Sequence, residues 1–286
     1  MKANQAGERA ILITGCSSGI GLCCAKGLHE RGYRVFATAR RQEDVDRLNA
    51  MGLNSLRLDL NDSASIKHAL DKVLEQTGGR LYGLFNNAGY GQPGAVEDLS
   101  RDTLRKQFET NFFGTIELTN LVIPMMRQQN EGRILINSSV LGIIAMPMRG
   151  AYNATKFALE GMMDTLRLEL RNTNIHISLI EPGPILSQFR ANSLRAFEEN
   201  IDISNSVHRE NYQRTLARLK KEGPAVPFTL PPEAVLQRVL HALESPRPKI
   251  RYPVTFPTYL FSFLKRILTH RFLDRVLSKA AKTGNS

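Results

Sequence analysis

A tyrosine and a lysine in the segment YNATK, Tyr152 and Lys156, have the spacing and the chemistry to move a proton. Residues four apart on a helix share one face, so the two side chains would lie side by side. A phenol has an ordinary pKa of about 10, and a neighbouring ammonium favours the phenolate and pulls that pKa toward neutrality. The pair would then serve as a tuned general acid or base. The same spacing is also common in solvent-exposed helix pairs.

Ser139 precedes Tyr152 by 13 residues and ends an apolar segment that is typical of a strand. Folds with a parallel sheet bind their ligands at the carboxyl ends of the strands. A hydroxyl there could hydrogen-bond a substrate carbonyl while Tyr152 supplies the proton. Ser138 is the alternative for this role, but strand side chains alternate, so its hydroxyl should point to the opposite face.

The glycine-rich segment TGCSSGIG follows the first apolar run and opens a helical one. Gly15, Gly19 and Gly21 allow a tight turn, and the free N–H groups of the following helix suit a pyrophosphate. Their spacing differs from the common Gly-x-Gly-x-x-Gly pattern. The later segment NNAG, residues 86–89, has small residues over which a ribose or adenine could pass, although Asn and Gly also favour ordinary turns.

The segment FATARR ends in Arg40 and Arg41, about twenty residues after the glycines. In nucleotide-binding folds an acid near this point bonds a free 2′-hydroxyl, whereas an arginine accommodates a 2′-phosphate. No Asp or Glu occurs from 33 to 42. We therefore predict that Arg40, helped by Ser17 or Ser18, selects NADP(H), and that Arg41 is its solvated neighbour or shares its role.

Apolar runs alternate with helical patterns along the chain. Strands are predicted at 9–15, 33–39, 54–60, 81–89, 132–139, 175–183 and 248–254. Helices are predicted at 19–31, 42–51, 63–77, 101–128, 151–171 and 232–244. The alternation predicts right-handed βαβ units and one α/β domain, a Rossmann-like doubly wound parallel sheet of seven strands.

Two segments do not follow this alternation of strands and helices. Residues 184–231 follow a strand's carboxyl end, where such folds place substrate lids. The apolar residues of this segment indicate a lipophilic aldehyde, ketone, retinoid or steroid-like substrate, unless they pack the lid's own helices: Leu186, Phe189, Leu194, Phe197, Ile201, Ile203 and Tyr212. Residues 256–286 form a basic extension whose stretch 256–277 predicts an amphipathic helix. That helix could lie on an anionic membrane or dock on its own domain or a second subunit.

Composition narrows the class of protein. The 286 residues are 42% hydrophobic and 23% charged, as in an ordinary soluble protein, and no run reaches the roughly 18 apolar residues of a spanning helix. The N-terminus lacks a secretory pattern, so we expect a cytoplasmic protein, with peripheral contact at the inner membrane face as the other option. Three unpaired cysteines and scattered histidines predict no metal site.

The net charge of +11 is concentrated at one end. Residues 247–286 contain nine Lys/Arg and one acid, Asp274, so the remaining chain carries only +3. No nucleic-acid-binding motif accompanies this charge, and we expect no nucleic-acid partner.

The motifs in this order resemble the short-chain dehydrogenase/reductase family over about residues 8–255. They are Thr14-Gly15-x3-Gly19-x-Gly21, Asn86-Asn87-Ala88-Gly89, Asn111, Ser139, Tyr152-x3-Lys156 and Pro182-Gly183. The segments ITGCSSGIGL, RLYGLFNNAGYG, SLIEPGPI and RYPVT are similar to the branch that contains YbbO-type aldehyde reductases and vertebrate estradiol 17-beta and retinol dehydrogenases. Two positions depart from the family pattern, Thr155 before the lysine and Ser187 in place of a threonine.

The resemblance implies roles for four residues. Tyr152 would protonate a carbonyl oxygen as hydride arrives, or deprotonate an alcohol in the reverse direction. Lys156 would lower the Tyr152 pKa and bind the nicotinamide ribose, and Ser139 would orient the carbonyl. Asn111 would hold, through its backbone, a water that links Lys156 to solvent.

The resemblance also implies the cofactor contacts, with Asp59 at the adenine and Ile185 at the carboxamide. The full expected set is Gly15, Ser17, Ser18, Gly19, Ile20, Gly21, Arg40, Asp59, Leu60, Asn87, Ala88, Gly89, Tyr152, Lys156, Pro182, Gly183, Ile185 and Ser187. The sequence thus predicts an NADP(H)-dependent oxidoreductase acting on a small-molecule carbonyl or alcohol, with an NADP(H)-binding regulator without turnover as the alternative. We expect a homo-oligomer, with a dimer favoured.

Overall fold

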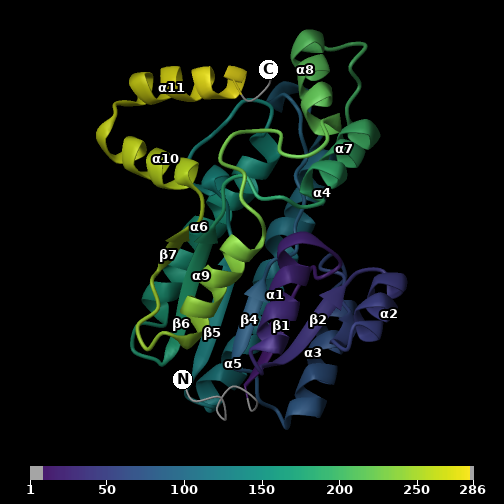
Figure 1. Ribbon diagram of the computed structural model, residues 1–286, viewed down its shortest axis with the longest axis vertical. Helices are drawn as coiled ribbons and strands as arrows, with labels where there is room; N and C mark the ends of the chain where they lie inside the picture. The colour runs from purple at the N-terminus through teal and green to yellow at the C-terminus, as the bar shows by residue number, and fades with distance from the viewer. Residues whose placement is uncertain (1–8, 284–286) are drawn as a thin grey trace.

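The computed structural model describes residues 9–283. Its strands form one parallel sheet in the order β3-β2-β1-β4-β5-β6-β7 (Figure 1). Their bounds are β1 (Ala10–Ile13), β2 (Arg34–Ala39), β3 (Asn54–Arg57), β4 (Gly83–Asn86), β5 (Gly132–Asn137), β6 (Ile175–Glu181) and β7 (Arg251–Pro253). The predicted seven-stranded doubly wound sheet is confirmed.

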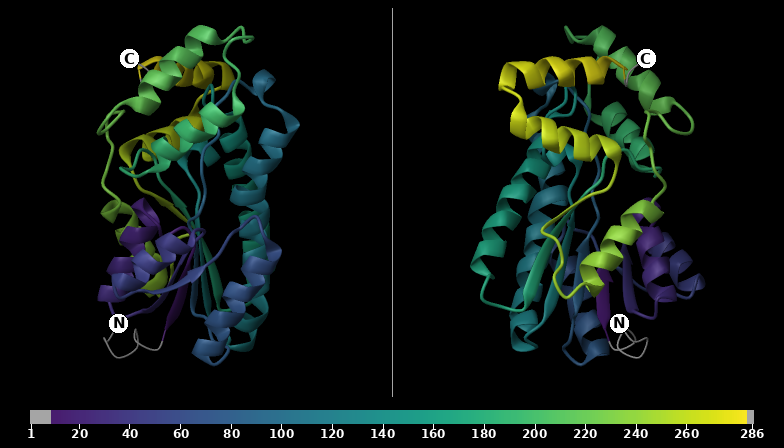
Figure 2. Two further views of the ribbon diagram at one scale, coloured as in Figure 1. Left: turned by 90° about the vertical axis from the view of Figure 1, so that its right-hand side faces the viewer. Right: turned by 60° about the vertical axis from the view of Figure 1, so that its left-hand side comes forward.

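Helices cover both faces of the sheet, as the edge-on view in Figure 2 shows. One face packs on α1 (Gly19–Glu30), α2 (Gln42–Ala50) and α9 (Glu233–Glu244). The other packs on α3 (Ser63–Thr77), α5 (Gly114–Gln128) and α6 (Gly150–Glu169). Neighbouring strand residues enter opposite cores: Ile11 and Ile13 face α1, while Leu12 faces α5. Burial on both faces explains the continuous apolar runs.

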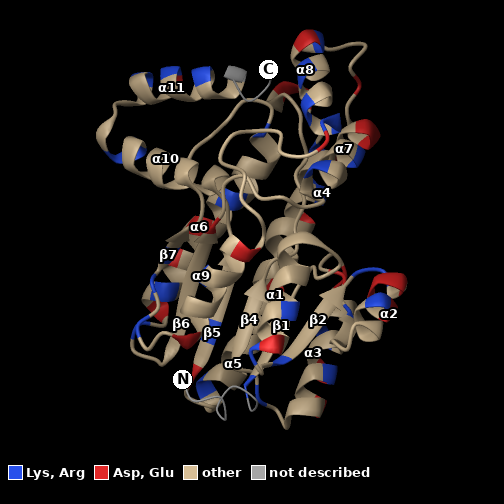
Figure 3. Ribbon diagram, viewed as in Figure 1, with Lys and Arg blue, Asp and Glu red and all other residues tan. Residues whose placement is uncertain are grey.

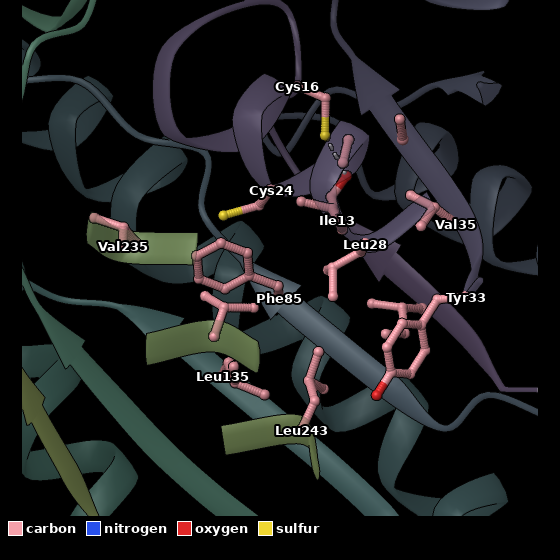
Figure 4. Close-up of a cluster of buried hydrophobic side chains, with 14 of the residues drawn as sticks. Ile13, Cys16, Cys24, Leu28, Tyr33, Val35, Phe85, Leu135, Val235 and Leu243 are labelled. Atoms are coloured by element: carbon pink, nitrogen blue, oxygen red, sulfur yellow. Dashed lines mark hydrogen bonds between the residues drawn. The ribbon is translucent and has the colours of Figure 1, made fainter. Parts of the chain in front are cut away.

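The core between the sheet and helices α1, α2 and α9 shows how side chains from the helices pack against the strands (Figure 4). Leu28 of α1 and Val235 and Leu243 of α9 close over Phe85 of β4, and all four side chains are at most 1% exposed. Burying each such side chain stabilises the fold by about 1.5–3 kcal/mol relative to leaving it exposed. The strand ends that carry the polar motifs are thereby fixed relative to one another.

One predicted helix, 101–128, is interrupted in the structure. It divides into α4 (Arg101–Phe108), a five-residue π-helical segment at Glu109–Phe113, and α5. The prediction of one regular helix is wrong here, because the spacing of apolar residues does not tell the i→i+5 bonding of a π turn from the bonding of an α-helix. Such segments are frequent at functional sites, and this one contains Asn111.

The segment 184–231 contains two helices, α7 (Phe189–Asn200) and α8 (Arg209–Lys220), which lie above the strand ends in Figure 1. Tyr212 of α8 is fully buried, accepts a hydrogen bond from the Ala95 amide at 3.0 Å and donates one to Asp98. Five of the seven apolar residues noted above pack in or against this small core: Leu194, Phe197, Ile201, Ile203 and Tyr212. Their packing holds α7 and α8 together, so their apolar character is not evidence for a lipophilic substrate.

The C-terminal extension forms two helices, α10 (Phe256–Ile267) and α11 (His270–Thr283). The predicted single helix over 256–277 is wrong, because Leu268 is extended and Thr269, a residue type favoured just before a helix, restarts the chain. The apolar side of α11, including Leu273 and Leu277, packs with Phe261 of α10 against the segment around Ile144. The helix therefore docks on its own domain, one of the alternatives considered above.

The outward-facing side of the C-terminal extension is exposed to solvent. Lys and Arg, blue in Figure 3, lie at the end of α10 and along α11. Exposed apolar side chains on α10 include Phe256, Phe263 and Ile267. No helix within residues 9–283 is long and apolar enough to cross a membrane. Contact of this surface with a membrane stays a prediction.

Candidate active site

The turn between β1 and α1 is packed so closely that only glycine fits. A Cβ atom on Gly21 would lie 2.2 Å from the Gly15 carbonyl oxygen, and one on Gly19 would lie 2.8 Å from Cβ of Ser187. Gly15 and Gly19 also have positive φ angles, 72° and 55°. Ser18 at the N-cap makes no side-chain capping bond, so amides of the first turn of α1 remain available. This cradle fits the pyrophosphate of a dinucleotide.

The segment NNAG is tied to that turn. The Asn87 side chain donates to the carbonyls of Thr14 at 2.9 Å and Gly15 at 3.1 Å. The Thr14 hydroxyl accepts from the amides of Asn87 and Ala88, both at 3.0 Å. Asn137 at the end of β5 donates to the Asn87 side chain at 3.0 Å. The ends of β1, β4 and β5 are thereby joined, with Gly89 directly beyond.

Arginines gather at the end of β2. Arg40 and Arg41 are both exposed there. Arg47 of α2 donates to the Ser17 carbonyl at 2.7 Å, and Arg57 donates to the Arg40 carbonyl at 3.2 Å. Sequence reasoning missed Arg47 and Arg57. Their positions on an exposed helix face and at a strand end give no signal until the fold brings Arg47 to the glycine turn and Arg57 to the end of β2.

Asp59 and Leu60 follow β3 on the same edge of the sheet. The Asp59 carboxylate accepts the Asn61 amide at 3.0 Å, which shapes the turn. Leu60 is buried, and its carbonyl oxygen would be 2.0 Å from a Cβ on Gly114, so α5 approaches this turn closely.

Tyr152, Lys156 and Ser139 come together at one cavity of about 540 Å³ beyond the ends of β5 and β6. Each of the three is less than a tenth exposed. The Lys156 ammonium donates to the Asn137 carbonyl at 2.6 Å and lies 5.6 Å from the centre of the Tyr152 ring. The Ser139 oxygen accepts the Leu141 amide at 3.1 Å, which leaves its proton available.

The protonation of this group differs from the expectation. Burial raises the pKa of Tyr152 to about 12, and the neighbouring Ser139 hydroxyl only partly opposes that effect. The predicted lowering of this pKa by Lys156 is not seen, because the ammonium is turned to the Asn137 carbonyl. Burial lowers the pKa of Lys156 to about 8, while the charge of Glu160 raises it. At neutral pH Tyr152 is therefore a phenol, the form that can donate a proton.

Ser138 is engaged elsewhere. Its hydroxyl donates to Glu160, one turn beyond Lys156 on α6, and Glu160 also accepts a bond from Arg251 of β7 at 3.0 Å. Arg251 further contacts the buried Glu181 at 3.2 Å, where burial raises the carboxyl pKa to about 8. This network lies behind Lys156 and explains the segment RYPVT as a structural partner of α6.

Asn111 acts through its side chain on the neighbouring loop. Its amide group accepts from the Tyr90 amide at 3.1 Å and donates to the Tyr90 carbonyl at 2.9 Å. It also donates to the Thr155 hydroxyl at 3.3 Å. The contact fixes the π segment against α6 beside Lys156, while the water expected at its backbone stays a prediction.

The segment after β6 forms another wall of the cavity. The Pro182 carbonyl accepts the Val140 amide at 2.8 Å, and a Cβ on Gly183 would meet the Thr255 hydroxyl at 2.1 Å. Phe189 at the start of α7 stacks edge-on against Tyr152 with ring centres 5.3 Å apart. Of the predicted contacts, Ile20, Ile185 and Ser187 also line the cavity.

Several lining residues had no sequence signal, because their segments are distant along the chain. They come from the loop before α6, from α8 and from α10: Met146, Met148, Arg149, Thr215, Arg218, Phe256, Leu260 and Phe261.

Comparison with known proteins agrees with this geometry. The family model for short chain dehydrogenases matches residues 9–197. The chain belongs to the short-chain dehydrogenase/reductase family. It is 43% identical over 270 residues to an uncharacterized oxidoreductase, YbbO, of Escherichia coli, covering 94% of each chain. It is 35% identical over 257 residues to human 17-beta-hydroxysteroid dehydrogenase type 1, covering 86% of this chain and 77% of the human one.

A solved structure agrees at the level of the fold. A family member from Burkholderia phymatum, in complex with NAD, superposes with a TM-score of 0.77 at 24% identity and covers 94% of this chain and 95% of its own. An oxidoreductase of the short-chain dehydrogenase/reductase family is thus the coarse description of the protein.

The cradle gives a first test. Gly21→Ala should weaken NAD(P)H binding and lower the free energy of unfolding by about 1–3 kcal/mol, because the added methyl overlaps the Gly15 carbonyl. Gly161→Ala is the matched control, since no atom lies within 4 Å of its Cβ position on α6, and alanine should stabilise that helix by about 0.5–1 kcal/mol. Calorimetric titration and urea unfolding measure the two effects. Equal behaviour of the two variants would contradict the close packing of the turn.

Proposed function

We propose that the protein is an NADP(H)-dependent carbonyl reductase for lipophilic aldehydes or ketones, able to run in the alcohol-oxidising direction as well. The observation that carries the proposal is the meeting of Tyr152, Lys156 and Ser139 at one buried cavity. Family membership supports the reaction class.

The roles of the three residues follow from their protonation and contacts. The cofactor, when bound, supplies hydride to the carbonyl carbon. Tyr152 is a phenol at neutral pH and donates its proton to the carbonyl oxygen. Ser139 hydrogen-bonds the same oxygen and stabilises the negative charge that develops there. Lys156 carries positive charge below about pH 8 and lies 5.6 Å from the centre of the Tyr152 ring. We expect its ammonium to turn from the Asn137 carbonyl toward the phenolate that Tyr152 becomes, and to stabilise it there.

The cofactor preference rests on the arginines beyond β2. Arg40 is accompanied by Arg47 and Arg57, whose guanidinium groups are held at the carbonyls of Ser17 and Arg40. Arginine is suited to a phosphate because its planar donor set is bidentate and always charged. The other cofactor contacts expected from the sequence, among them Ser18 and Ser187, are part of this proposal.

The substrate class rests on the cavity wall rather than on the lid core. Leu186 and Phe189 line it from the lid, and Met146, Met148 and Leu260 line it from other segments. One relative is named for a hydroxysteroid, a large lipophilic alcohol. An apolar wall of this kind favours a substrate that loses hydration on binding.

A non-catalytic regulator is the other candidate, and reduction of an aldehyde panel with NADPH separates the two. The expected homodimer and a cytoplasmic location stay predictions.

Tyr152→Phe tests the catalytic assignment. The substitution keeps the ring that stacks on Phe189 but removes the proton, so kcat should fall at least about 100-fold while calorimetry still detects NADPH binding. Tyr259→Phe is the matched control, since Tyr259 is 49% exposed on α10. Turnover retained in Tyr152→Phe would reject the assignment.

Arg40→Asp tests the cofactor preference. The kcat/KM ratio of NADPH over NADH should fall roughly 10- to 100-fold, the effect of losing a charge-assisted bond and adding a repulsive charge. Arg41→Asp makes the same change of charge at the next exposed position and should alter the ratio far less. If Arg40→Asp leaves the ratio as it is, the phosphate contact is not at Arg40.

A further inference from the structure

The cavity next to Tyr152 is lined by cations with no acid to balance them. Its described lining contains four of them, Arg149, Lys156, Arg190 and Arg218, and no Asp or Glu. Lys156 belongs to the catalytic group. The three arginines come from the loop before α6 and from α7 and α8, away from the glycine turn that fits the pyrophosphate. Their charge is therefore not explained by the cofactor cradle.

Arg190 is accounted for by structure. Its guanidinium donates to the carbonyls of Arg218 at 3.4 Å and Gly223 at 2.5 Å, so it ties α7 to the C-terminal end of α8. Carbonyl oxygens near a helix C-terminus are favourable partners for a cation. Arg190 therefore holds the lid together and needs no ligand to compensate its charge.

Arg218 has no such partner. Its Nε atom is fully buried and makes no hydrogen bond with any residue from 9 to 283. Burial lowers the pKa of the guanidinium, and no carboxylate in the described chain offsets that effect. A buried cation is costly unless a counter-charge or hydrogen-bond acceptors compensate it. A guanidinium keeps its charge, so an anion that enters the cavity is a favourable partner for it.

Arg149 faces the same cavity from a second element. It is half-buried at the start of α6, and its side chain forms no hydrogen bond or ion pair within the described chain. Met148, its neighbour, packs in one cluster with Leu219, the neighbour of Arg218. The loop before α6 and the end of α8 therefore pack on one hydrophobic cluster, and both arginines line the cavity beside it.

The position of Arg218 is rigid. Tyr212 on the same helix is buried and bonded to Ala95 and Asp98, which anchors α8 to the segment before α4. Both guanidinium groups line one cavity from anchored elements, and a guanidinium is the donor that a carboxylate or phosphate oxygen prefers.

We propose that Arg149 and Arg218 bind a terminal oxyanion, a carboxylate or a phosphate, on a substrate whose apolar body fills the cavity and whose carbonyl reaches Tyr152. The proposal rests on the proposed reductase function and narrows its substrate class. The substrate is an amphiphile with an oxo group and an anionic group separated by a hydrocarbon segment. A wholly apolar steroid or retinoid would leave both cations uncompensated.

The test compares a long ω-oxo fatty acid with its methyl ester, which carry the same aldehyde and differ only in the anionic end. The wild-type kcat/KM for the acid should exceed that for the ester at least about 10-fold, and Arg218→Met should lower this ratio at least about 10-fold. Arg149→Met is a second variant with the same expectation. Arg214→Met is the control, because Arg214 lies on the same helix but is exposed and contacts Glu210 at 3.7 Å.

Binding separates this proposal from the reductase assignment. Calorimetry with the corresponding alkanoate and alkyl phosphate needs no turnover, and the stronger ligand tells which oxyanion the site takes. Equal reduction of acid and ester by the wild type, with neither anion bound, would overturn the oxyanion site and leave the reductase function standing. Binding of the anions without reduction of either aldehyde would overturn the reductase function instead.

Discussion

The site depends on one constraint, the burial of the Lys156 ammonium beside the carbonyl of Asn137. A cation held there, 4% exposed, is stabilised by the last carbonyl of β5 and by the charge of Glu160 one turn along α6. Both partners are fixed only because parallel strands end at one edge of the sheet and α6 packs across it. The same burial raises the pKa of Tyr152 to about 12, so the phenol keeps the proton that a reduction requires. It lowers the pKa of Lys156 only to about 8, so the ammonium is still charged at neutral pH.

The parts that build the cavity come from chain segments with little in common. The lid contributes Phe189, which covers Tyr152, and the loop before α6 contributes Met148. The C-terminal helix α10 contributes Phe261, and α11 covers that helix through Leu277. The extension that the sequence set apart as a tail is therefore part of the cavity wall. Its exposed side, with Phe263, is separate from that wall.

Sequence reasoning was strongest where a local rule determines the outcome. The seven parallel strands follow from the alternation of apolar and helical segments, and the glycine turn follows from packing that leaves no room for a Cβ at Gly21. It failed where the outcome depends on distant contacts. The π segment at 109–113 and the break at Leu268 are features of backbone geometry that the spacing of apolar residues does not reveal. The direction of the Tyr152 pKa required the degree of burial, which spacing alone cannot supply.

The arginines show the same limit more clearly. Arg40 follows the second strand, where the charge of the residue is expected to select between cofactors in a fold of this kind, so it could be identified from the sequence. In the sequence, Arg47, Arg149 and Arg218 are ordinary helix or loop residues. In the tertiary structure Arg149 and Arg218 line one cavity, and Arg47 bonds the glycine turn. Their charge can be interpreted only once the partners that each one has or lacks are known.

The most direct test of the central claim is the pH dependence of kcat/KM for aldehyde reduction. Because charged Lys156 is required and its pKa is about 8, activity should be level below that pH and fall about tenfold per unit above it. Glu160→Gln should move the break to lower pH, since the Glu160 charge raises the Lys156 pKa, whereas Asp164→Asn, which removes another carboxylate bound to Arg251, should not. A profile that stays level well above pH 8, or a break that Glu160→Gln leaves in place, would contradict the account.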